Sequence, residues 1–304
     1  MAPRKTLIGT LERALMTQMS RLRMPKTKGT LTMPGLNAPV EVIRDRWGVP
    51  HIYAENKADL FFAQGFVHAQ DRLFQMELNR RTAAGRLSEV FGELSLDTDR
   101  FVRTFGFNRL GRTDWEQAAP QVKDALKAYA AGVNAYIEHP HCKMPLELIM
   151  LRYEMETWQP EDSAIFSRLM IWQMSHAWQG ELVRAEIAEK VGVERAAELD
   201  IHYPNSNPVT LPEGIEFNAL DPDGNLRNVL GPFLARGKGS NEWVIAPQRS
   251  QTGHAVLAND MHLVLGIPSL WYEVHLNAPG YHVTGVSLPG LPMVLVGHNE
   301  RIAS

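Results

Sequence analysis

Hydrophobic positions recur at a helical spacing over most of the first two hundred residues. Near the N-terminus, apolar side chains three or four positions apart predict an amphipathic helix within residues 1–33, at Leu11, Leu15, Met19 and Leu22. A longer pattern predicts a helix over residues 59–91, with Asp59 as its N-cap. Similar patterns predict further helices over residues 121–138, 163–178 and 181–199.

Shorter apolar segments occur in two other places. Residues 39–53 alternate as a strand does, with Trp47-Gly48-Val49-Pro50 as a turn signal. After Gly239, apolar segments separated by Gly and Pro predict strands over residues 243–246, 255–258, 271–276 and 281–286. Helices followed by strands predict an α+β fold. Between residues 203 and 239, Pro, Gly, Asn and Asp recur every few positions, which predicts a linker.

The composition is that of an ordinary globular protein. The chain has 304 residues, of which 44% are hydrophobic and 21% charged, enough to bury a sizeable core. Its net charge of −3, with basic residues clustered only near the N-terminus, argues against a nucleic-acid partner. Glu12, Arg13 and Arg21 interrupt the apolar N-terminal segment, so we expect no secretory signal, no membrane span and, by default, a cytoplasmic location. A single cysteine, Cys142, excludes an intrachain disulfide.

The segment Gly237-Lys238-Gly239-Ser240-Asn241 places a serine between a glycine and an apolar strand. A serine hydroxyl needs an adjacent base, and a freed α-amino group with a pKa of roughly 7.7 to 8 can act as one. Glycine before the serine permits the strained backbone that attack on the preceding peptide bond requires. These residues alone favour a simple turn that leads into a strand.

Five ordered blocks extend this pattern, and together they resemble the start of the catalytic chain of the penicillin acylase family of N-terminal nucleophile hydrolases. They are residues 240–246, 257–263, 268–273, 283–292 and 297–299. Residues 44–52 and 65–77 resemble the opening of the smaller chain of the same family. The resemblance runs from about residue 39 to the end, and is weakest over residues 200–235. It implies the N-terminal part of an αββα sandwich.

The resemblance also implies how the chain is divided. Residues 1–33 form an N-terminal extension, 34–204 the smaller chain, 205–239 a spacer and 240–304 the start of the catalytic chain. Such a precursor cuts itself between Gly239 and Ser240, and the smaller and larger chains stay associated without a covalent bond. The implied activity is hydrolysis of a small-molecule acyl amide, whose acyl group and amine the sequence leaves open.

Three site residues follow from the matched positions. Ser240 is the implied nucleophile, acting through an acyl-enzyme, and His262 stands where the homoserine-lactone and cephalosporin acylases carry a histidine beside the freed amine. Asn241 is implied in the hydrogen-bonded framework of the site. Read from the residues alone, a strand histidine is often structural, and asparagine is a common turn residue.

Further residues carry weaker implications. No cofactor is implied for catalysis, but Glu181 falls where the smaller chain offers a carboxylate to a structural calcium ion; a glutamate near a helix start is also favoured by the helix dipole. Trp178, Leu263 and Val296 are candidate pocket residues that fit an apolar core equally well. The charged residues of the 59–91 helix could contact substrate, but we favour a buried network of Asp71 with Arg80 or Arg81.

Two alternatives to an acylase stay open. The first alternative is a metal-dependent hydrolase, because five histidines and Asp260 could bind a metal ion. No pair of these histidines has the H-E-x-x-H spacing. The five are His254, His262, His275, His282 and His298. Residues 231–240 do not match a phosphate-binding loop, because Gly239 stands where Ser or Thr belongs. The resemblance further implies oxyanion donors beyond Ser304, so we expect the 304 residues alone to be an inactive fragment.

Overall fold

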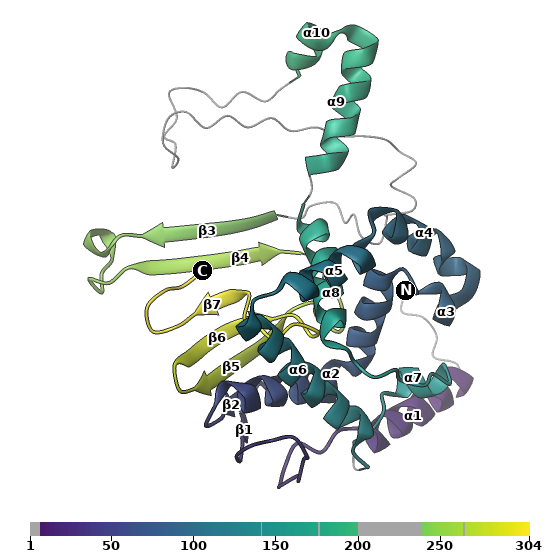
Figure 1. Ribbon diagram of the computed structural model, residues 1–304, viewed down its shortest axis with the longest axis vertical. Coiled ribbons are helices and arrows are strands. Elements are labelled where there is room, and N and C mark those ends of the chain that lie inside the picture. The colour runs from purple at the N-terminus through teal and green to yellow at the C-terminus, as the bar shows by residue number, and fades with distance from the viewer. Residues whose placement is uncertain (1–6, 141, 176, 200–238, 264) are drawn as a thin grey trace. The chain divides into compact units, whose positions relative to one another are not determined.

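The computed structural model describes residues 7–140, 142–175, 177–199, 239–263 and 265–304 (Figure 1). The chain divides into two compact units, residues 1–168 with 237–304 and residues 169–236. The predicted linker between residues 203 and 239 lies outside the described residues except for Gly239. The predicted division at residues 33, 204 and 239 into extension, chains and spacer stays a prediction.

The first unit holds most of the helices. They are α1 (Leu7–Leu22), α2 (Lys57–Ala84), α3 (Ser88–Phe91), the 3-10 helix η1 (Gly92–Ser95), α4 (Leu96–Phe105), α5 (Phe107–Gln117), α6 (Pro120–Glu138) and α7 (Leu146–Met150). Helix α8 (Pro160–Met174) spans the division between the units. The second unit contains α9 (Ala177–Val191) and α10 (Val193–Ala197). The N-terminal helix and the helix over residues 121–138 are confirmed.

The boundaries of three predicted helices were wrong. The helix predicted over residues 163–178 is α8, which begins at Pro160 and ends at Met174. Helix α2 is capped by Asn56 and not by Asp59: the Asn56 side chain accepts a hydrogen bond of 2.8 Å from the Asp59 backbone N–H. The helix ends at Ala84 because Gly85 adopts a left-handed conformation with φ of 66°, a common helix stop. In the second unit, Gly192 with φ of 86° separates α9 from α10, so residues 181–199 are not one helix.

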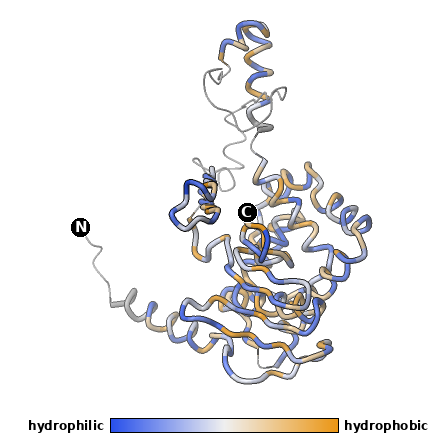
Figure 2. Tube along the Cα trace, turned by 90° about the vertical axis from the view of Figure 1, so that its left-hand side faces the viewer, coloured by the Kyte–Doolittle hydropathy of each residue, from blue (hydrophilic) through white to orange (hydrophobic). Residues whose placement is uncertain are grey.

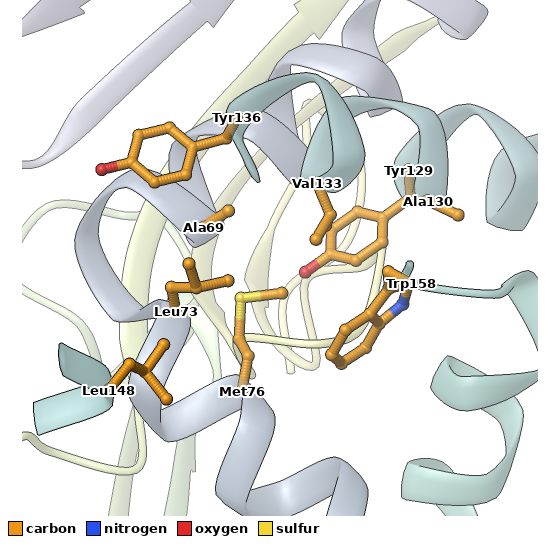
Figure 3. Close-up of a cluster of buried hydrophobic side chains, with 9 residues drawn as sticks. All are labelled: Ala69, Leu73, Met76, Tyr129, Ala130, Val133, Tyr136, Leu148 and Trp158. Atoms are coloured by element: carbon orange, nitrogen blue, oxygen red, sulfur yellow. The ribbon is translucent and has the colours of Figure 1, made fainter. Parts of the chain in front are cut away.

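Helices α2 and α6 cross closely at two glycines. A Cβ on Gly65 would lie 2.1 Å from the carbonyl oxygen of Tyr129, and one on Gly132 would lie 1.8 Å from that of Phe62. Around this crossing, a buried cluster joins α2, α6, α7 and the segment before α8 (Figure 3): Ala69, Leu73, Met76, Tyr129, Ala130, Val133, Tyr136, Leu148 and Trp158. This packing fixes the helical layer of the first unit.

One face of a five-stranded sheet packs on α2. The strand order is β1 (Glu41–Arg44), β2 (Pro50–Tyr53), β5 (Tyr272–Ala278), β6 (Tyr281–Ser287) and β7 (Val296–His298). The β2–β5 pair is parallel and the other neighbouring pairs are antiparallel. Buried and more exposed residues alternate along β5, and Ile52, Val274 and Leu276 pack against Leu60 and Val67 of α2. Figure 2 shows hydrophobic and hydrophilic residues interspersed along the trace.

The predicted strand over residues 39–53 is a hairpin, with its turn at the predicted place. The Asp45 side chain accepts hydrogen bonds from the backbone N–H groups of Trp47 and Val49, at 2.8 and 3.0 Å. Strand β7, by contrast, was not predicted. The mixture of helices and mostly antiparallel strands agrees with the α+β prediction, although β1 and β2 precede most helices and β2 pairs in parallel with β5.

Candidate active site

Ser240 lies on an exposed hairpin of β3 (Gly239–Ile245) and β4 (Val256–His262), separate from the five-stranded sheet. The strands pair antiparallel, so that Gly239 is opposite His262 and Ser240 opposite Met261. The Ser240 hydroxyl donates a hydrogen bond of 2.7 Å to the carbonyl oxygen of Gly239. The hydroxyl therefore rests against the peptide bond that the predicted self-cleavage would break.

His262 ends β4 beside the start of β3. Its Nε2 lies 2.7 Å from Oδ2 of Asp260, and both side chains are exposed. Because a carboxylate only accepts, Nε2 carries the proton, and the Nδ1 of the neutral ring keeps a lone pair. Asp260 thus orients the ring and leaves Nδ1 free to accept a proton.

The strand pleat separates the side chains of Ser240 and His262. Residues directly opposite each other in an antiparallel pair share a face, and successive residues alternate faces. His262 therefore shares a face with Asp260 and with Asn241, which lies opposite Asp260. Ser240 shares the other face with Met261. His262 thus lies opposite Gly239, on the face away from the Ser240 side chain.

The predicted pocket residues lie in three separate elements. Trp178 is in α9, and its side chain is outside the described part of the chain. Leu263 follows β4 and is half-buried, whereas Val296 belongs to β7 and pairs with Val286. The substrate pocket stays a prediction.

Glu181 lies in α9 with an exposed side chain. Within the described residues, no three side chains of His, Cys, Asp or Glu converge on a point that could hold a metal ion. The calcium site therefore stays a prediction, and the metal-dependent alternative gains no support from the described part of the chain.

The ion network on α2 has other partners than predicted. Asp71 binds Arg44 of β1, whose Nη1 lies 2.8 Å from Oδ2 of Asp71, and it accepts a hydrogen bond from the Tyr272 hydroxyl. Arg80 and Arg81 instead pair with Glu77. On one helix, only residues three or four positions apart reach each other, and Asp71 is too far along α2 from either arginine.

A buried polar chain that the sequence did not predict centres on His68 of α2. The Ser287 hydroxyl donates to the Tyr272 carbonyl at 2.9 Å, so it accepts from His68 Nε2–H at 3.0 Å. His68 Nδ1 then accepts from the Tyr129 hydroxyl at 2.8 Å, whose oxygen accepts from the Gly290 N–H at 2.8 Å. Burial, and then the charge of Arg72, lower the pKa of His68 to about 3, so the ring is neutral at neutral pH.

Comparison of the chain with known proteins identifies its family. The family described as Penicillin amidase matches residues 39–303. The chain belongs to the penicillin amidase family. It is 38% identical over 291 residues to "Penicillin acylase 2 proenzyme" of Pseudomonas sp. (strain SE83), and 37% identical over 289 residues to "Acyl-homoserine lactone acylase QuiP" of Pseudomonas aeruginosa.

The matches cover 92% of this chain but only 37% and 34% of the two relatives, so the chain spans about a third of their length. A solved structure, thermostable penicillin G acylase from Alcaligenes faecalis, is 26% identical, with a TM-score of 0.45, covering 58% of this chain and 98% of that one. None of the helices in the described part of the chain has both the length and the apolar character needed to cross a membrane.

Proposed function

We propose that this chain is the N-terminal part of a self-processing amide hydrolase precursor, in which Ser240 becomes the N-terminal nucleophile. The observation that carries the proposal is the geometry at the start of β3: the Ser240 hydroxyl rests on the Gly239 carbonyl, and His262 lies in register across the hairpin. The names of two relatives, a penicillin acylase proenzyme and an acyl-homoserine lactone acylase, support the same reaction class.

Processing needs one attack by the serine oxygen. Ser240 Oγ adds to the carbonyl carbon of Gly239, and the C–N bond of the resulting tetrahedral intermediate breaks, which leaves an ester on Oγ and a free amine on Ser240. Water then hydrolyses the ester to give the Gly239 carboxylate. The same oxygen afterwards attacks a substrate amide, passes through an acyl-enzyme and is released by water.

The freed amine of Ser240 is the base when the Ser240 hydroxyl attacks the substrate amide. An ammonium cannot accept the serine proton, so the amine must be neutral for the attack. In this proposal His262, which lies opposite Gly239 across the hairpin, accepts a proton from the ammonium on Nδ1, since Asp260 holds the His262 proton on Nε2. Asn241, on the face of His262, would support the arrangement as a positioning residue.

The two parts of the precursor are already joined without the Gly239–Ser240 bond. Strands β2 and β5 pair across the proposed cut, Asp71 binds Tyr272, and His68 binds Ser287. These contacts support the proposal that the smaller and larger chains stay together after processing. The αββα sandwich, a calcium ion at Glu181, a pocket of Trp178, Leu263 and Val296, and a small acyl amide as substrate belong to the same proposal.

Mass spectrometry of the protein as its source organism makes it tests the cut directly. We expect one chain to begin at Ser240, and Ser240→Ala to give a single uncut chain without amidase activity. Ser250→Ala, on the same hairpin, is the matched control and should process normally. An uncut protein with full activity would remove Ser240 from the reaction, and an uncut, inactive wild type would support the inactive-fragment alternative.

A further inference from the structure

Three histidines form a row on the face of the five-stranded sheet that points away from α2. Ile52, Val274, Leu276 and Val283 pack toward α2, so the alternation of the strands directs His51 of β2, His275 of β5 and His282 of β6 to the other face. His51 Nδ1 lies 3.1 Å from His275 Nδ1, and His275 Nε2 lies 2.9 Å from His282 Nε2. A carboxylate stands at one end, with Glu300 Oε1 3.1 Å from His282 Nδ1.

We propose that His275 and His282 bind a divalent transition-metal ion of the Ni²⁺ or Cu²⁺ class through their Nε2 atoms. With metal–nitrogen bonds of about 2.1 Å, two nitrogens at a right angle lie about 3.0 Å apart, and two at a tetrahedral angle about 3.4 Å apart. The observed separation of 2.9 Å fits the right angle, which square-planar and octahedral ions adopt.

In both rings the Nδ1 atom, which would not bind the metal, has a hydrogen-bond acceptor. A ligating histidine usually donates its other N–H to an acceptor, which fixes the tautomer and directs the lone pair to the metal. Glu300 provides this acceptor for His282 Nδ1, and His51 Nδ1 provides it for His275 Nδ1.

The site is open to an ion from solution. The side chain of His282 is 45% exposed, and that of Glu300 is 75% exposed. No three side chains of His, Cys, Asp or Glu converge within the described residues, so in this proposal those residues supply two ligands and water completes the coordination. The proposal uses residues outside the Ser240 hairpin and does not rest on the proposed function.

Ni²⁺ titration of the full chain, followed by calorimetry, tests the site. The chain contains 11 histidines, so the tightest binding event must be compared between variants. We expect His282→Gln to weaken it at least tenfold and Glu300→Gln to weaken it about 10- to 100-fold, as loss of an outer-shell acceptor does. His254→Gln, an exposed histidine outside the row, is the matched control and should bind as the wild type does.

A second readout separates loss of the ligand from loss of the fold. Ni²⁺ should raise the melting temperature of the wild type and of His254→Gln but not that of His282→Gln, whose own melting temperature should match the wild type because the side chain is exposed. Equal Ni²⁺ affinity in His282→Gln and the wild type, or an equal loss in His254→Gln, would overturn the proposal.

Discussion

Acidification should destabilise the first unit through His68. The ring is fully buried between α2, α6 and β6, and its Nδ1 accepts the Tyr129 hydroxyl while its Nε2–H donates to Ser287. Protonation places a proton on Nδ1, turns that acceptor into a donor and puts a charge in the core. The fold therefore holds His68 neutral, with a pKa of about 3 against 6.5 for the free side chain.

The sign and size of the effect follow from the two pKa values. Between pH 6.5 and 3 the unfolded chain binds the proton and the folded chain does not, so the free energy of unfolding falls as the pH falls. The slope is about 1.4 kcal/mol per pH unit, which amounts to about 3 kcal/mol at pH 4.5. Above pH 6.5 both states are neutral, and His68 adds no pH dependence.

Urea unfolding at pH 7 and pH 4.5, in the wild type and in His68→Gln, measures this term. At pH 7 the variant should be less stable by about 1–3 kcal/mol, because the Tyr129 hydroxyl loses its buried acceptor. At pH 4.5 the difference should vanish or reverse, because glutamine does not titrate and the carboxylates common to both proteins cancel. His254→Gln, on the exposed hairpin, should follow the wild type.

Parallel stability curves for the wild type and His68→Gln between pH 7 and pH 4.5 would refute the reasoning. Such curves would mean that water or a local rearrangement stabilises the charged His68 ring, and that the buried hydrogen-bonded side chains tolerate protonation.

Four other substitutions test the packing, the buried ion pairs and the hairpin. Gly132→Ala should cost about 1–3 kcal/mol or more by calorimetry, because its Cβ would overlap the Phe62 carbonyl and force α2 from α6. Glu77→Gln should cost about 3–5 kcal/mol in urea unfolding, because Arg80 and Arg81 both lose their most buried carboxylate partner, whereas the half-exposed Glu156→Gln should cost under about 1 kcal/mol. His262→Ala should leave the melting temperature unchanged but lower amidase turnover about 10- to 10,000-fold in the processed enzyme; a lower melting temperature with normal turnover would make His262 structural.

Local signals in the sequence were sufficient where neighbours in the chain decide the structure. The helix over residues 121–138 was predicted to within one residue, because its period and its proline start are local. The turn at residues 47–50 and the Gly239-Ser240 pair could be identified from the sequence because their signals are also local. Where a local signal was overlooked, as at Gly85 and Gly192, the helix boundaries were wrong.

Only the tertiary structure decided which distant residues meet. Asp71 of α2 is paired with Arg44 of β1, 27 positions earlier, and no sequence signal near Asp71 indicates that partner. His68 and Ser287 are separated by 219 positions, and His51 and His275 by 224. Such contacts depend on the parallel pairing of β2 with β5, which sets strands from both sides of residue 239 side by side.

The candidate site divides in the same way. The sequence by itself placed Ser240 directly after Gly239, so the proposed nucleophile and the peptide bond that it would attack are adjacent in the chain. The tertiary structure decided that His262 lies opposite Gly239 and on the other face from the Ser240 side chain, because strand register fixes which residues are opposite and the pleat fixes which face each side chain occupies. Register is a property of two paired strands, and one strand's sequence does not contain it.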